Sequence, residues 1–200
     1  MVLDQKKPQS EIRVNQVDKA YGTKQVLKSL SMTIRKPSIT GIMGGSGIGK
    51  TTLLRLLLNL EQPDSGSITG LEKERISALF QEDRLCEDFN AIANVKMVCP
   101  AQVQIEEIIE AFIEIGISKE ELIKPVRTFS GGMKRRVAVL RCLFADSTVL
   151  IMDEPLTGLD EKSKEQVIHF MKKRMQSKTV IFVTHIREEI TMLGGELVLL

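Results

Sequence analysis

The sequence contains no tryptophan, one tyrosine and three cysteines among its 200 residues. Cys86, Cys99 and Cys142 are odd in number and none of them stands in a C-x-x-C pair. The pattern therefore predicts neither a disulfide framework nor a zinc site. Unpaired cysteines of this kind are typical of a reducing compartment, so we expect a cytoplasmic protein.

Long apolar runs and a charge excess are also missing. The most apolar helical stretch, 53–60, is far shorter than the roughly 18 residues that cross a bilayer and contains Arg55 and Asn59. Residues 1–10 are polar and charged, which does not fit a signal peptide. The net charge of +2 comes from 28 basic and 26 acidic residues, too balanced to indicate a nucleic-acid partner.

Two basic triplets do occur, at 134–136 and 172–174. Both fall on the polar faces of segments with helical periodicity. We expect them to be solvated surface rather than a binding patch.

Residues 44–51 have the sequence Gly-Gly-Ser-Gly-Ile-Gly-Lys-Thr, which fits the pattern G-x-x-x-x-G-K-[ST] at every fixed position. An apolar strand pattern precedes it at 39–43 and a leucine-rich helix pattern follows at 52–60. Such a loop turns backbone N–H groups toward a phosphate chain, and the helix N-terminus adds partial positive charge. The side chain of Lys50 would reach the outer phosphates and the Thr51 hydroxyl would hold Mg²⁺. The candidate phosphate-binding residues are Gly44, Gly45, Ser46, Gly47, Ile48, Gly49, Lys50, Thr51 and Thr52.

Strand and helix patterns alternate along most of the chain. Antiparallel strands are expected within 12–34, short strands at 67–69 and 76–80, and buried parallel strands at 149–152 and 180–183. Helical periodicity dominates from about 90 to 144, with Gly116 as a cap between two helices. We expect a single α/β domain over 1–200. We expect it to have the P-loop NTPase fold, with a mostly parallel central sheet, an N-terminal antiparallel β subdomain and an α-helical subdomain inserted at about 90–144.

Two carboxylates follow the buried strand at 149–152. Asp153 can hold Mg²⁺ against phosphates in the glycine loop, and Glu154 can polarise an attacking water. Strand alternation would send the two side chains to opposite sides of the strand end. The alternative is an exposed acidic pair that opens a turn before Pro155.

Residues 130–132, Ser-Gly-Gly, begin the second amphipathic helix. They could form an anion site from backbone N–H groups, a hydroxyl and the helix dipole. Ser130 could equally be an ordinary N-cap, and the local residues do not decide between the two.

The order of the motifs resembles that of the ATP-binding-cassette (ABC) ATPases over nearly the whole chain. After the glycine loop come Gln81 behind a strand, Ser-Gly-Gly at 130–132, Asp153-Glu154-Pro155, the segment 156–160 (Leu-Thr-Gly-Leu-Asp) and Val183-Thr184-His185. The resemblance implies that 44–52 is the Walker A loop and that the cofactors are ATP and Mg²⁺.

The resemblance also implies a role for each remaining motif residue. Gln81 would sense Mg²⁺ and water, Asp153 would be the Walker B aspartate, Glu154 the catalytic glutamate and His185 the switch histidine. The single tyrosine, Tyr21, would stack on adenine. Asp160 would be the D-loop aspartate.

Ser130, Gly131 and Gly132 resemble the signature that contacts the γ-phosphate of ATP held by a second subunit. A head-to-tail dimer of two ATPase subunits, normally two copies of this chain, would then enclose two ATP molecules. The signature departs from the family pattern at Phe129 and Met133, where Leu and Gln are usual. Met133 removes an amide from the surface that would face the partner's nucleotide.

The leading functional hypothesis is the ATPase subunit of a transporter, bound at the cytoplasmic face of the membrane to permease subunits in separate chains. The segment 80–85, with Asn90-Ala91 and Asn94-Val95, resembles importers of nitrate, sulfonate and taurine. An export or lipid-handling complex is the near alternative. A soluble ABC ATPase acting on DNA or ribosomes, or an adaptor without turnover, would belong to a different class.

Overall fold

The computed structural model describes residues 11–200; the first ten, on which the expectation of no signal peptide rests, lie outside the described residues. The strands form two sheets. Strands β2 (Lys24–Arg35), β1 (Glu11–Tyr21) and β4 (Ser65–Thr69) make an antiparallel sheet in that spatial order. The second sheet is parallel, in the order β5-β6-β7-β3-β8, which confirms the predicted α/β fold with antiparallel N-terminal strands.

The parallel sheet consists of β3 (Ile39–Met43), β5 (Ile76–Leu79), β6 (Val149–Asp153), β7 (Thr179–Val183) and β8 (Glu196–Leu199). Every residue of β6 and of β7 is buried. Both strands are mostly apolar because both faces of a parallel sheet are covered. The order places β3, β6 and β7 near one another, so their carboxyl ends meet at one edge, where α/β proteins bind ligands.

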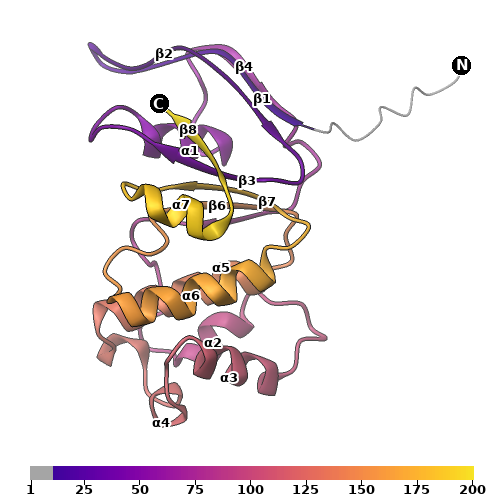
Figure 1. The fold of residues 1–200 in the computed structure, drawn as a ribbon, viewed down its shortest axis with the longest axis vertical. Coiled ribbons are helices and arrows are strands. Elements are labelled where there is room, and N and C mark those ends of the chain that lie inside the picture. Colours follow the sequence, from indigo (N-terminus) through magenta and orange to yellow (C-terminus); the bar gives the residue numbers. More distant parts are fainter. Residues whose placement is uncertain (1–10) are drawn as a thin grey trace, which may run out of the picture.

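The two faces of this sheet have separate cores. The helix α1 (Lys50–Leu57) lies between the parallel sheet and the antiparallel sheet (Figure 1) and packs in one cluster with Val149 and Ile151. On the other face, Leu150 and Met152 pack against α5 (Gly131–Phe144) and α6 (Glu161–Arg174). Because successive side chains of β6 point to opposite faces of the sheet, this strand contributes residues to both cores.

Helices occupy the end of the molecule farthest from the antiparallel sheet (Figure 1). These are α2 (Ala91–Lys96), α3 (Ile105–Glu114), α4 (Lys119–Leu122) and the 3₁₀ helix η1 (Val126–Thr128). A further helix, α7 (Arg187–Leu193), precedes β8. Helices α2, α3, α4, η1 and α5, but not α7, fall inside the predicted helical segment, whose limits of about 90 and 144 stay a prediction. No helix in residues 11–200 combines the length and the apolar character that spanning a bilayer requires.

The leucine-rich helix was expected at 52–60, but α1 begins two residues earlier and ends at Leu57. Its N-cap is Gly49, so Lys50 and Thr51 belong to the first helical turn. Beyond the helix, Asn59 has a φ of 54°, a left-handed backbone conformation that is incompatible with a right-handed helix. This start aims the backbone N–H groups of the first turn at the loop that precedes it.

The basic triplet at 134–136 is not solvated surface as expected. Arg135 is only 4% exposed and is held inside the molecule. Arg136 is half-buried; its guanidinium donates to the carbonyl oxygens of Ile115 and Gly116, each at 2.9 Å, and burial lowers its pKa. The second triplet meets the expectation at Lys172 and Lys173, which are exposed.

Candidate functional site

The loop between β3 and α1 is tightly turned and packs against the antiparallel sheet. Gly47 and Gly49 have φ values of 74° and 113°, which favour glycine. A Cβ atom on Gly49 would lie 2.6 Å from Cδ2 of Leu27 in β2. Glycine at 49 is therefore needed for both its backbone conformation and its close approach to β2.

Lys50 is curled over this loop. Its side chain is largely buried, and Nζ donates to the carbonyl oxygens of Gly44 at 2.8 Å and Gly45 at 2.9 Å. An ammonium has three donors. The geometry holds a positive charge against the mouth of the loop, where the outer phosphates of a nucleotide would lie.

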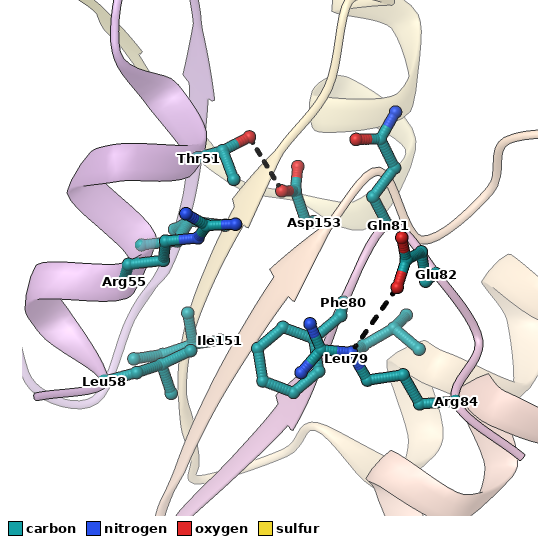
Figure 2. A pocket seen from close by; sticks show the side chains of 11 residues that line it. Thr51, Arg55, Leu58, Leu79, Phe80, Gln81, Glu82, Arg84, Ile151 and Asp153 are labelled. Atoms are coloured by element: carbon teal, nitrogen blue, oxygen red, sulfur yellow. Dashed lines mark hydrogen bonds and ion pairs between the residues drawn. The ribbon is translucent and has the colours of Figure 1, made fainter. Parts of the chain in front are cut away.

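Thr51 and Asp153 join the loop to the end of β6. The Thr51 hydroxyl donates to Oδ2 of Asp153 at 3.0 Å (Figure 2). Asp153 is 5% exposed, and burial raises the pKa of its carboxyl group, against the lowering effect of the Thr51 hydrogen bond. Hydroxyl and carboxylate oxygens are ligands that Mg²⁺ prefers, so this pair fits the ion in chemistry and placement.

Glu154 does not point away from Asp153 as strand alternation predicts. Its φ is 48°, in the left-handed region, so the backbone turns at the strand end. Both carboxylates consequently line one cavity. Oε1 of Glu154 lies 2.9 Å from Nε2 of His185, and the Thr157 hydroxyl donates to Oε2 at 2.9 Å. Two partners thus fix the orientation of the Glu154 carboxylate.

The cavity has a volume of about 330 Å³ and is the place where the glycine loop meets Gln81, the Asp153-Glu154 pair and His185. It lies at the carboxyl edge of the parallel sheet and combines the glycine loop, the start of α1, the end of β6, Gln81 after β5 and His185 after β7. Its lining residues are Val26, Ser46, Gly47, Gly49, Lys50, Thr51, Thr52, Gln81, Asp153, Glu154, Val183 and His185. The Lys50 side chain, the candidate magnesium ligands Thr51 and Asp153, and the Glu154 carboxylate therefore line the same cavity.

Tyr21 does not line this cavity. It ends β1, is 44% exposed and donates its hydroxyl hydrogen to the Glu61 carboxylate. Nζ of Lys19 lies 5.7 Å from the centre of its ring. A cation thus lies over one face of the ring, and the adenine-stacking role stays a prediction.

The signature residues also lie outside the cavity, at the start of α5. Ser130 is the N-cap, and its hydroxyl accepts from the Met133 N–H at 3.3 Å. A Cβ atom on Gly132 would lie 3.1 Å from the carbonyl oxygen of Gly158, so this helix start touches the loop before α6. Gly131, by contrast, has open space around it. The N-cap interpretation of Ser130 is realised in this chain, and it leaves the glycine backbone free for an outside ligand.

Asp160 caps α6 at the end of that same loop. Its carboxylate accepts from the Ser163 N–H at 2.9 Å and from the Ser163 hydroxyl at 2.8 Å. These hydrogen bonds lower the pKa of Asp160. The residue therefore shapes the loop that contacts Gly132, and it lies apart from the cavity.

Arg135 is a residue of the site that no sequence motif indicated. Its guanidinium donates to backbone carbonyls on both sides of the site, including those of Phe80 at 2.8 Å and Glu154 at 2.6 Å. The missed signal was a second buried face of α5. Ala138 and Cys142 follow Arg135 at helical spacing and are buried.

Comparisons with known proteins agree with this geometry. The family model described as "ABC transporter" matches residues 27–157, which include the glycine loop and the Asp153-Glu154 pair. The chain belongs to the ABC transporter family. The ABC chain is also similar to Nod factor export ATP-binding protein I of several bacteria. It is 33% identical to that of Ralstonia nicotianae (93% of this chain, 63% of the relative), 34% to that of Cupriavidus pinatubonensis (89% and 59%) and 33% to that of Rhizobium meliloti (97% and 62%). It thus spans about three fifths of the length of these curated relatives.

Solved structures of ABC cassettes match the whole fold. The dimeric, post-hydrolysis state of the ATP-binding cassette MJ0796 bound to ADP and Pi has a TM-score of 0.81 and 25% identity, over 94% of each chain. A second dimeric structure of MJ0796, a bacterial ABC transporter cassette, has the same TM-score and 26% identity. This chain is therefore an ABC ATPase cassette, which confirms the predicted fold and the predicted ATPase class. The particular importer type predicted from the sequence is not among these relatives.

Proposed function

We propose that this protein is the ATP-hydrolysing subunit of a transporter whose membrane subunits are separate chains. The observation that carries the proposal is the convergence of Lys50, Thr51, Asp153 and Glu154 on one cavity. Phosphoryl transfer to water depends mainly on positioning and charge stabilisation, and these side chains supply both. The ATPase would work at the cytoplasmic face of the membrane, bound to membrane-spanning subunits.

Each cavity residue has a task in this reaction. Lys50 and the loop N–H groups stabilise charge on the outer phosphates. The Thr51 hydroxyl and the Asp153 carboxylate would hold Mg²⁺ with Gln81 alongside, and the bound ion would neutralise phosphate charge. The Glu154 carboxylate, held by His185 and Thr157, orients the attacking water.

A second subunit completes the site. The glycine backbone at 131–132 lies outside its own chain's cavity, and the space around Gly131 is open. A head-to-tail pair would bring this helix start to the nucleotide held by the other copy, with Asp160 at the same interface. The dimeric state of the MJ0796 cassette supports this arrangement. ATP binding would close the pair and hydrolysis would release it.

The direction of transport has two candidates. The relatives named as Nod factor export ATP-binding proteins favour export. The likeness of 80–85 and 90–95 to nitrate, sulfonate and taurine importers favours import. Because the relatives match along about nine tenths of this chain, whereas the importer likeness is confined to a short segment, we propose export.

Two measurements test the proposal. Purified wild-type protein should hydrolyse ATP, and Glu154→Gln should retain ATP, turn over at least about tenfold more slowly and elute as a dimer with ATP in gel filtration. Lys50→Ala, which loses the loop cation, should elute as a monomer. Hydrolysis by a protein that stays monomeric with ATP would contradict the two-subunit site.

The transport role is tested by affinity purification from membranes of the native host. Recovery of a multi-spanning membrane protein supports the transport role. Whether vesicles that contain the complex export or import a solute then decides the direction of transport. Recovery of ribosomes or DNA instead would favour a soluble ABC ATPase and contradict the transporter proposal.

A further inference from the structure

Arg135 binds the segment that follows β5. Its side chain is 5% exposed and lies on α5, one turn after the glycine pair at 131–132. Nη1 donates to the carbonyl oxygen of Phe80 at 2.8 Å and contacts Oδ1 of Asp83 at 2.9 Å. Gln81 stands between these two residues, so its backbone is held on both sides.

The second guanidinium nitrogen binds the end of β6. Nη2 donates to the carbonyl oxygen of Asp153 at 2.5 Å and to that of Glu154 at 2.6 Å. The second contact falls on the residue with the left-handed backbone. A non-glycine residue persists at positive φ only where its surroundings hold it there.

One rigid side chain therefore links three parts of the molecule: the helix that begins with the signature, the loop that carries Gln81, and the strand end that carries Asp153 and Glu154. A guanidinium is planar and always charged, and its donors point in fixed directions. Its Nε is buried and has no hydrogen-bond partner among the described residues. Among the described residues, the hydrogen bonds of this guanidinium are therefore those that Nη1 and Nη2 make.

We propose that Arg135 is a positioning residue for ATP hydrolysis. It holds Glu154 and Gln81 in their places relative to each other and ties both to the orientation of α5. When the start of α5 meets the nucleotide of a second subunit, Arg135 transmits that contact to the carboxylate that orients water. The inference rests on the proposed ATPase function. It requires no contact between Arg135 and the nucleotide.

Lysine is the informative replacement. It keeps the positive charge near Asp83 but has a single nitrogen, which cannot hold the carbonyls of Phe80 and Glu154 in a fixed fork. Arg135→Lys therefore removes the bridge while keeping the charge. Arg135→Gln removes both.

The test is steady-state hydrolysis and nucleotide binding by the full chain. Arg135→Lys should lower kcat by about 10- to 100-fold, as misplaced catalytic groups do. The affinity for a fluorescent ATP analogue should change by no more than about threefold, because the residues that bind phosphate are untouched. Lys134→Gln is the matched control: it removes the neighbouring cation, which pairs with Glu87 at 2.8 Å, and should leave kcat unchanged.

A double-mutant cycle separates positioning from a general loss of structure. If Arg135 acts through Glu154, adding Arg135→Lys to Glu154→Gln should reduce the residual turnover by less than about threefold. The full single-mutant loss in that background would overturn the inference. So would an unchanged kcat in Arg135→Lys, or a loss confined to nucleotide affinity.

Asp83→Ala covers the case in which the Arg135 variants do not fold. The Asp83 side chain is partly buried, at 23% exposed, and without it Arg135 still donates to the carbonyl oxygens of Phe80, Asp153 and Glu154, so the variant should fold. It frees one side of the fork and should lower kcat at unchanged affinity; no effect on kcat would then overturn the inference. If the wild-type protein itself hydrolyses no ATP, the proposed function fails instead.

Discussion

Replacing Gly49 with alanine should lower the thermal unfolding midpoint, Tm, of the protein substantially. The backbone of an alanine at this position would have to adopt a φ of 113° at the start of α1. Left-handed backbone of this kind costs a non-glycine residue about 1–3 kcal/mol. The added Cβ atom would lie 2.6 Å from Cδ2 of Leu27 and 3.2 Å from the carbonyl oxygen of Val26.

The crowding adds to the backbone strain because the neighbours cannot move aside. Leu27 is 3% exposed and packed in the core between the two sheets. Overpacking of this kind costs about 1–3 kcal/mol, so the total is about 2–6 kcal/mol. For a domain of this size that corresponds to a fall in Tm of about 5–20 °C.

Gly45→Ala is the matched control in the same loop. Gly45 lies outside the left-handed region, and a Cβ atom there meets nothing within 4 Å. Thermal and urea unfolding, followed by circular dichroism without nucleotide, should place Gly45→Ala within about 1 kcal/mol of wild type. If both variants were equally stable, the close packing of this loop against β2 would be refuted.

Three further predictions concern single side chains. Burial raises the pKa of Asp153 above its ordinary 3.8, so just above that pH the native protein binds more protons than the unfolded chain. The free energy of unfolding therefore falls as pH rises through the native pKa of Asp153, and Asp153→Asn should flatten that part of a plot of urea midpoint against pH. An unchanged plot would contradict the raised pKa of Asp153. Burial raises the pKa of Cys142 to about 11, so at pH 8 a thiol reagent should label exposed Cys86 at once and Cys142 only on unfolding; equal rates, measured by peptide mass spectrometry, would show that α5 is open. Tyr21→Ala should weaken ATP binding by about 5- to 150-fold, as loss of base stacking does, while Tyr21→Phe retains it; calorimetry that finds equal affinities for both would remove Tyr21 from the site.

The parts of the site that could be predicted from sequence are those with local or periodic signals. The glycine loop has fixed spacing, and β6 is a continuous apolar run that ends at Asp153. Because parallel strands end at one edge, the meeting of the loop with Asp153 and His185 followed from the order of the motifs.

What could not be predicted depends on tertiary contacts. The turn at Glu154 comes from a positive φ that no residue preference signals, since glutamate seldom adopts it. Arg135 sits in a basic triplet that is ordinarily exposed, and only the packing of α5 against two loops buries it. The early start of α1 depends on Gly49 packing against β2, a contact distant in sequence.

A crystal structure of Glu154→Gln with ATP and Mg²⁺ would show whether the glycine loop and Asp153 bind one nucleotide and its metal ion. We expect the triphosphate in the loop beside Lys50, with the metal ion between the Thr51 hydroxyl and the Asp153 carboxylate and the signature of a second copy over the γ-phosphate. A nucleotide bound on another surface, or a metal ion that Asp153 does not approach, would contradict this expectation.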